Sequence, residues 1–342
     1  MSIKYFMFAY RVLSRLYFHL PVLFLFFISK NLSLTSIALL LAIYPAAIFA
    51  TSLVKSKLAI DAKMFLYVSA ILNIISYYLI VFYGHYVSFV CAQLILGCSY
   101  ALAAGEDSKL LFASNTSQLL QQNIQRSSNS MMFLSSLFSG IVGGYFYTID
   151  PSYNFYLAIV ANLIILPMLW LLQTKKIKVL KQVTASQQAN NITMQDFAYY
   201  SLTRGIVLGL FVGFIPFLLS KNSPSPFIFA LIICCYMLTG YLSSQFTDKL
   251  FINMRHAQII STALIAVGTV ILSISQSEVG IACALVTYGL GTGMVRPITM
   301  KKIKNPVDMN KLERYFSLVN IAVLLGLALI YQFYIGEINL PI

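Results

Sequence analysis

Charged residues are scarce in this chain. Aspartate and glutamate together number 10 in 342 residues, and all charged residues make up only 10%. Hydrophobic residues make up 59%, and the mean hydropathy is +0.81. A water-soluble globule of this length needs more polar surface than that, so a soluble globular protein is excluded. The composition predicts that lipid surrounds the chain.

The residue patterns of enzymes are missing as well. The three histidines, His19, His85 and His256, lie in different segments without metal-ligand spacing. There is no glycine-rich phosphate loop, and no nucleophile is framed by a base. The cysteines all lie inside apolar runs, which favours a role as small core residues. We therefore expect no enzymatic activity, no metal and no cofactor.

The net charge of +13 does not indicate nucleic acid. Lysine and arginine are spread over short loops between apolar runs, and they form no continuous basic stripe interleaved with aromatic residues. Basic loop residues of membrane proteins usually set the orientation of the chain, so membrane lipid is the expected surrounding partner.

Apolar runs of about 20 residues recur along the chain, which is the length that a helix needs to cross a bilayer. They predict an all-α, polytopic transmembrane helical bundle, because these runs are too long and too continuous for the strands of a barrel. We expect about eleven spans, near residues 10–30, 36–54, 64–83, 87–108, 128–149, 152–173, 198–219, 226–247, 256–275, 278–299 and 314–336.

The basic residues then fix an orientation. With the N-terminus inside, 20 lysines and arginines fall on the inner side, whereas only Lys30 and Lys221 fall on the outer side. The positive-inside rule therefore places the N-terminus in the cytoplasm, and an odd number of spans places the C-terminus outside.

One long polar stretch divides the chain. Residues 174–197 carry four lysines followed by a run of glutamine, asparagine, serine and threonine, with no apolar periodicity. We predict a six-helix bundle over residues 1–173, a cytoplasmic linker over 174–197 and a five-helix bundle over 198–342.

Several motifs follow the same order as in a known family. The stretch AAGEDSKLLF (103–112) closes the fourth span, SGIVGG (139–144) lies within the fifth, and VRPITMKKIKNPVDMNKLERYFSLVN (295–320) leads into the last. Together with Arg126 at the start of the fifth span, they make the chain similar to a bacterial exporter-like group of the major facilitator superfamily. The resemblance implies two helical halves that move a solute by alternating access.

The chain departs from that family in two places. The loop between the second and third spans reads TSLVKSKLAIDAK (51–63), so the glycines of the family's signature are missing. If that loop latches the two halves by charge pairing, as the resemblance implies, its only acid, Asp61, is a candidate gate or ion-pair residue. We also expect the family's twelfth helix to be missing, because the residues that follow Gly336 are too few to cross a membrane.

The fourth span carries the main candidate residues for transport. Gln93, Tyr100 and Asp107 recur at helical spacing and predict a polar face towards a cavity. Glu106 and Asp107 are adjacent carboxylates, which suits the uptake of a proton. The alternative is a structural ion pair with Lys109 or with Arg126.

Other candidates lie near the ends of spans. Arg204 either faces the cleft, where it would bind an anionic solute, or snorkels to the cytoplasmic surface. Arg15 and His19 lie one turn apart, and His19 is either a hydrogen-bonded structural residue or a proton relay. Arg296 and Arg314 flank the last cytoplasmic loop and suit a gate or an anchor.

These observations predict a secondary transporter of the inner membrane for a small organic solute. The resemblance to exporters implies export coupled to inward movement of protons. The alternative is a protein of the same scaffold that does not transport, and instead senses a ligand or binds a partner.

Overall fold

The structure is a computed structural model that describes residues 3–55, 57–58, 60–112, 118–172, 193–222, 224–250, 254–275, 277–302 and 306–334. Within these ranges the secondary structure is helical and contains no strand. The helices are α1 (Ile3–Leu13), the 3₁₀ turn η1 (Leu20–Val22), α2 (Leu23–Ser29), α3 (Leu34–Lys55), α4 (Ala62–Tyr83), α5 (Tyr86–Ala103), α6 (Glu106–Phe112), α7 (Gln118–Ile149), α8 (Tyr153–Leu171), α9 (Met194–Gly209), the π-helical η2 (Leu210–Phe214), α10 (Ile215–Lys221), α11 (Pro226–Leu250), α12 (Met254–Ile274), α13 (Glu278–Lys302) and α14 (Pro306–Tyr334).

Ten helical segments in the described ranges are long and apolar enough to cross a membrane. Large apolar side chains lie on the outside of the bundle, among them Trp170, Ile274 and Val279, each more than two-thirds exposed. An outer surface of this kind is stable in lipid and not in water. The prediction of an all-helical, multi-pass membrane bundle is confirmed.

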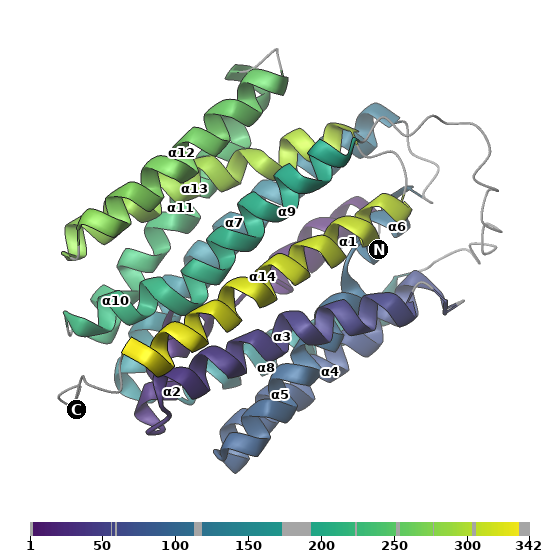
Figure 1. The fold of residues 1–342 in the computed structure, drawn as a ribbon. Helices are drawn as coiled ribbons and strands as arrows, with labels where there is room; N and C mark the ends of the chain where they lie inside the picture. The colour runs from purple at the N-terminus through teal and green to yellow at the C-terminus, as the bar shows by residue number, and fades with distance from the viewer. Residues whose placement is uncertain are drawn as a thin grey trace.

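The helices pack as two groups that meet along two helix pairs. Before the linker α5 packs between α3 and α4, and after it α13 packs between α11 and α12. The groups meet where α3 lies along α14 and where α7 lies along α11 (Figure 1). Gly205 and Gly209 of α9 have no side chain where Val319 and Val323 of α14 come close, which lets these two helices approach.

The first predicted span, 10–30, is wrong as a single helix. Helix α1 ends at Leu13, and the chain becomes helical again only at η1 and α2, which begin at Leu20. Pro21 has no backbone N–H to donate to the preceding turn, so it favours a new helical start at this point. Hydropathy does not reveal the break because the intervening residues are also largely apolar.

Helix α7 stabilises the break between α1 and η1. The hydroxyl of Ser135 donates to the carbonyl oxygen of Val12 over 2.6 Å, and that of Ser136 donates to the carbonyl of Arg15 over 3.3 Å. A side chain on Gly143 would overlap the carbonyl group of Phe18. Irregular backbone is tolerated at membrane depth only where protein or a cavity surrounds it and other groups bind its carbonyls, as they do here.

The seventh span begins at Met194, four residues before its predicted start at 198. Thr193 and Asp196 form a capping box that starts α9 at Met194: the Thr193 hydroxyl accepts from the Asp196 amide over 3.3 Å, and the Thr193 amide donates to the Asp196 carboxylate over 3.1 Å. Asp196, predicted to be a loop residue, is buried. Residues 174–192 of the predicted linker lie outside the described residues.

The seventh span is also interrupted. Between α9 and α10 the five residues of η2 form a π-helix just before Pro216. The carbonyl of Gly213 accepts a hydrogen bond from the Tyr331 hydroxyl of α14 over 2.9 Å, which satisfies one backbone group at the distortion. Short π-helical segments inside α-helices often mark functional sites.

Candidate functional site

A cavity of about 290 Å³ lies inside the bundle. Helix α1 with the broken stretch after it and helices α3, α4 and α5 form most of its wall, and α6, α7, α9, η2 and α14 also contribute to it. Both helix groups therefore contribute to one internal space. Its lining includes polar and charged residues: Tyr10, Arg11, Ser14, Arg15, Tyr17, His19, Tyr44, Ser69, Asn73, Tyr77, Gln93, Ser99, Tyr100, Asp107, Arg204 and Asn320.

Arg15 lies in an aromatic part of the wall. Its Nη1 donates to the hydroxyl of Tyr17 over 2.9 Å. Its guanidinium carbon lies 5.6 Å from the centre of the Tyr17 ring and 5.5 Å from that of Tyr100. The ring of Tyr44 packs against Tyr100, with 6.1 Å between centres. Among the described residues no carboxylate forms an ion pair with Arg15.

His19 also lines the cavity. The prediction that it shares one continuous helix with Arg15 is wrong, because both residues lie between the end of α1 and the start of η1. His19 caps the start of η1 without donating or accepting a side-chain cap bond. Its ring packs against Tyr77 and Phe155, at 5.0 and 5.5 Å between centres. The buried Nδ1 atom has no hydrogen-bond partner among the described residues, so that atom is available to a bound molecule.

Asp107 faces the cavity and is paired. Its Oδ2 atom lies 2.6 Å from Nε of Arg11, which is buried in the bundle. Arg11 also donates to the Ser108 hydroxyl over 3.1 Å. This pair joins α1 to α6, and it balances the charge of Asp107, the one acid among the described residues that line the cavity.

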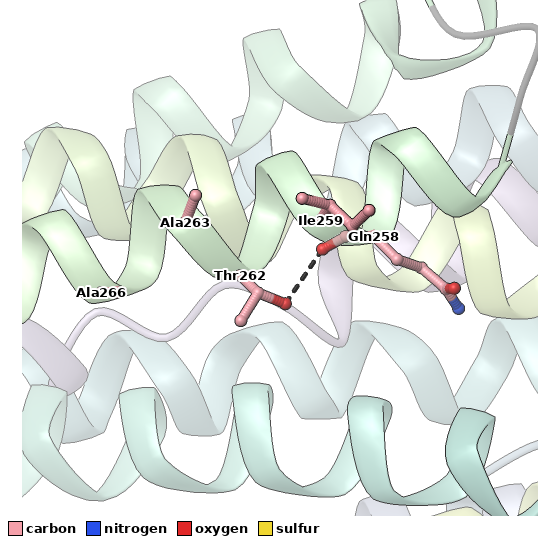
Figure 2. Close-up of a pocket in the computed structure, with 5 residues that line it drawn as sticks. All are labelled: Gln258, Ile259, Thr262, Ala263 and Ala266. Atoms are coloured by element: carbon pink, nitrogen blue, oxygen red, sulfur yellow. Dashed lines mark hydrogen bonds between the residues drawn. The ribbon is translucent and has the colours of Figure 1, made fainter.

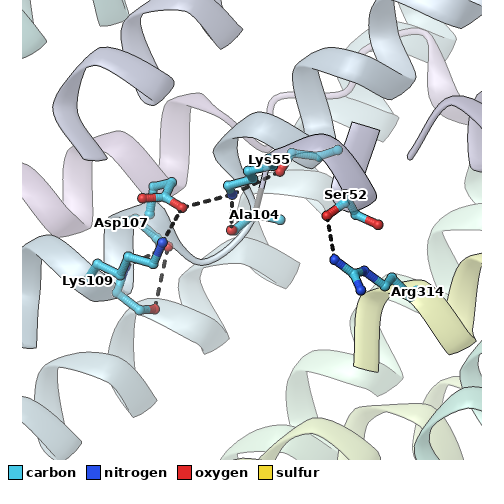
Figure 3. A network of polar contacts seen from close by, with 9 residues as sticks. Ser52, Lys55, Ala104, Asp107, Lys109 and Arg314 are labelled. Carbon is cyan, nitrogen blue, oxygen red and sulfur yellow. Dashed lines mark hydrogen bonds and ion pairs between the residues drawn. The ribbon is translucent and has the colours of Figure 1, made fainter. Parts of the chain in front are cut away.

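Glu106 forms ion pairs with other residues than its neighbour Asp107 does. Its buried carboxylate lies 2.9 Å from Nζ of Lys55 and 2.7 Å from Nζ of Lys109, and it does not line the cavity. Lys55 also donates to the carbonyl oxygens of Ala101 and Ala104 at the end of α5 (Figure 3). The structural alternative of the sequence prediction, an ion pair with Lys109, is therefore present. Lys55 is a further partner that sequence reasoning missed.

Arg204 and two amides complete the wall. The guanidinium of Arg204 donates to the Tyr200 hydroxyl and lies 5.1 Å from the centre of that ring and 5.4 Å from that of Phe316. Gln93 and Asn320 are both buried and line the cavity, and the Asn320 Oδ1 atom has no described partner.

Of the predicted gate residues, Arg314 joins the two helix groups and Asp61 does not. Arg314 Nη2 donates to the carbonyl of Ser52 on α3 over 2.8 Å (Figure 3), which joins the two helix groups. Asp61 is exposed at the start of α4, forms no side-chain cap bond and does not line the cavity. The side chains of Arg126 and Arg296 lie outside the described residues.

Sequence reasoning missed several residues of the wall. Arg11, Tyr17, Asn73 and Asn320 were not candidates. Arg11 carries no local signal, because it lies 96 positions from its partner Asp107. Asn73 and Asn320 are polar amides inside apolar runs, and that signal was available in the sequence.

A second hollow, of about 330 Å³, lies against α12 alone (Figure 2). Gln258, Ile259, Thr262, Ala263 and Ala266 line it, and the Thr262 hydroxyl donates to the carbonyl of Gln258 within the same helix. Residues of a single helix cannot enclose a solute. The internal cavity is therefore the candidate site.

Comparison with known proteins supports the fold. No family model and no curated protein sequence matches the chain. A crystal structure of the nucleoside transporter NupG is similar, with a TM-score of 0.67 at 14% identity, covering 99% of this chain and 92% of that chain. A point mutant of NupG has a TM-score of 0.72 at 13% identity, covering 97% of this chain and 91% of that chain. These two likenesses show that the chain shares the all-helical membrane fold of that transporter.

Proposed function

We propose that this protein is a secondary transporter that moves a small organic solute across the membrane by alternating access. The observation that carries the proposal is the internal cavity, whose wall comes from both helix groups and holds polar and charged side chains inside an apolar bundle. Ionisable groups at membrane depth are costly, and they are retained mainly where a solute or ion passes. The similar solved structures are those of a transporter and not of an enzyme, which supports the same class.

The arrangement of the halves suits this motion. The groups before and after the linker meet along α3 and α14 and along α7 and α11, with the cavity between them. Rocking one group against the other about these pairs exposes the cavity to each side in turn. We propose residues 1–173 and 198–342, with the second group extended back to Met194, as the two moving bodies.

We further propose the inner membrane as the location, with the N-terminus and the linker in the cytoplasm and the C-terminus outside. The distribution of basic residues over the loops supports this orientation. A reporter fused to each terminus tests it, and a cytoplasmic signal from the C-terminal fusion would reject it.

Export driven by inward movement of protons remains part of the proposal. Glu106 and Asp107 are its candidates, with Arg11, Lys55 and Lys109 as the cations that hold their negative charges. A proton that reaches either carboxylate weakens its ion pair, which gives a physical route from protonation to movement of helix α6 against α1 or α3.

Transport is tested with purified protein in proteoliposomes. A ligand-stabilisation screen first identifies a solute, because a true ligand raises the melting temperature by mass action. We then expect counterflow, in which unlabelled solute inside the vesicles drives accumulation of labelled solute. A solute that binds the protein but never crosses the bilayer would reject transport and favour a ligand sensor.

A further inference from the structure

Several buried polar side chains of the cavity wall are not hydrogen-bonded within the protein. Gln93 of α5, Tyr77 of α4 and Asn320 of α14 are each at most 3% exposed, and all three line the cavity. The two amides and the Tyr77 hydroxyl form no hydrogen bond with any residue that the structure describes. The great majority of buried polar groups are paired, so three exceptions on one cavity indicate a site for a polar molecule.

Two further groups belong to the same set. The hydroxyl of Tyr44 on α3 lines the cavity, and within the described ranges nothing bonds to it. The same holds for the Nδ1 atom of His19, whose ring is 7% exposed. Asn320 comes from the group after the linker and the other four residues from the group before it. The unpaired polar groups therefore span both halves of the bundle.

The chemistry of these groups selects between classes of solute. A side-chain amide offers both N–H donors and an oxygen acceptor, and its broad terminal torsion lets either end face a bound molecule. A phenol hydroxyl also donates and accepts. An ionised carboxylate or phosphate only accepts and an ammonium only donates, so each would leave half of these groups without a partner. Hydroxyl groups on a solute satisfy both halves.

Aromatic rings surround these polar groups. The rings of Tyr44 and Tyr100 pack with 6.1 Å between centres, and those of His19 and Tyr77 with 5.0 Å. All four residues line the cavity, so flat apolar faces alternate there with hydrogen-bonding groups. The volume of about 290 Å³ is close to the small end of ligand pockets, which suits a solute of one or two rings.

Arg15 is compatible with a hydroxylated solute. Its guanidinium donates to the Tyr17 hydroxyl and lies over the Tyr17 and Tyr100 rings. A guanidinium has five N–H donors, and a hydroxyl oxygen accepts from them as a carboxylate does. The charge of Arg15 alone does not decide between the two, so a matched pair of neutral and anionic probes is needed.

We infer that the solute is an uncharged cyclic compound with several hydroxyl groups, which bind Gln93, Tyr77 and Asn320 while its ring lies against Tyr44 and Tyr100. This inference rests on the proposed transport function and names its substrate class. The hydroxylated ring is a free sugar or cyclitol, or a sugar joined to an aromatic group, and both sources present the same hydroxyls. Because Gln93 and Asn320 belong to different halves, such a solute contacts both moving bodies.

Thermal unfolding of the purified full-length protein with small probes tests the inference. The detergent must have no sugar head group, because a glycoside detergent presents the same hydroxyls. Phenyl β-D-glucoside carries hydroxyls and an aromatic ring, phenyl β-D-glucuronide is its anionic analogue, and 2-phenoxytetrahydropyran keeps both rings without the hydroxyls. We expect the glucoside to raise the melting temperature and the other two to give little or no shift.

myo-Inositol distinguishes the two sources of the hydroxyls, because it is a hydroxylated ring without an aromatic group. A shift with inositol as well as the glucoside identifies a site for the hydroxylated ring alone. A shift with the glucoside and none with inositol identifies a site that also needs the aromatic group. Either result supports the inference.

Variants locate the binding. Gln93→Met and Asn320→Leu remove an amide and keep most of the side-chain volume, and each should weaken glucoside binding by about tenfold. Neither should lower the melting temperature of the empty protein, because neither amide bonds to a described residue. A structural amide would instead lower it. Either variant alone decides the result if the other fails to fold.

Asn154→Leu is the matched control. Asn154 of α8 is a buried amide whose two polar atoms also lack a partner in the described part of the chain, but it does not line the cavity. The same kind of substitution at this position should leave glucoside binding unchanged. Equal loss of binding in all three variants would show a general effect of removing buried amides and overturn the assignment of the site.

Three further outcomes would overturn the inference: equal or greater stabilisation by the glucuronide or by 2-phenoxytetrahydropyran, glucoside binding that survives both amide changes, or no shift with glucoside or inositol at millimolar concentration. The failure of transport is separable from these outcomes. Glucoside binding that needs Gln93 and Asn320 but gives no counterflow rejects the transport function alone. Counterflow of a solute without hydroxyls supports transport and overturns the substrate class.

Discussion

Arg314 at the start of the last span donates a hydrogen bond to the backbone carbonyl of Ser52 on α3, over 2.8 Å, and so links the two halves at one end of the bundle. A guanidinium that binds a carbonyl oxygen of the other half holds the two bodies together without needing an acid. The predicted latch residue Asp61 does not take part in this contact.

Replacing Arg314 with glutamine should loosen this end of the bundle. A charged donor to a carbonyl contributes about 1.5 kcal/mol, so we expect roughly tenfold faster hydrogen exchange in the last turns of α3. Mass spectrometry of peptides that cover 46–55 measures it. Lys57→Gln removes an exposed charge just beyond α3 and serves as the control. Equal exchange in both variants would show that the contact does not hold the halves.

Replacing Glu106 with glutamine should destabilise the protein strongly. The change leaves the buried ammonium of Lys55 without its counter-charge, and breaking a buried ion pair in this way costs about 3–5 kcal/mol. Lys109→Gln removes the exposed partner of the same carboxylate, and it should cost about 1 kcal/mol or less. Thermal unfolding in detergent compares the two variants, and a similar loss from both would contradict this ranking.

Replacing Gly143 with alanine should disturb the broken first segment. The added methyl group would overlap the Phe18 carbonyl, and overpacking of this kind costs about 1–3 kcal/mol. Gly326→Ala on α14 is the matched control, because open space surrounds that position and alanine is the better helix former. We expect a lower melting temperature for the first variant and an unchanged or higher one for the second. If both behave alike, the close approach of α7 does not shape the break.

Proton coupling is tested by neutralising its two candidate carboxylates. Glu106→Gln combined with Asp107→Asn should abolish uptake driven by a pH gradient into inverted vesicles, because neither amide takes up a proton in the working range. Asp150→Asn is the control, since among the described residues the Asp150 carboxylate accepts only from the local Ser152 amide, and it lies off the cavity. If a folded double variant showed unchanged uptake, both carboxylates would have a structural role only.

The sequence predicts the spans well because each is a local property. An apolar run such as 64–83 needs only its own hydropathy to be recognised, and α4 occupies Ala62–Tyr83. The start of α9 was also readable, because Thr193 and Asp196 have the spacing of a capping box, yet the surrounding polar run hid it.

The break after Leu13 and the ion pairs were not readable. The break depends on Ser135 and Gly143, which come from a helix more than 100 residues further along the chain. The choice of Arg11 for Asp107 and of Lys55 for Glu106 depends on how α1 and α3 pack against α6. Such partners are set by tertiary packing, and charge content alone does not identify them.

The broken stretch after α1 has a consequence for how the two halves would act on each other. The carbonyl groups of Val12 and Arg15 accept hydrogen bonds from Ser135 and Ser136 of α7, and α7 lies along α11 of the other half. A displacement of α11 would therefore reach Arg15 and Tyr17 through α7, so the shape of the cavity wall is coupled to the position of the opposite half.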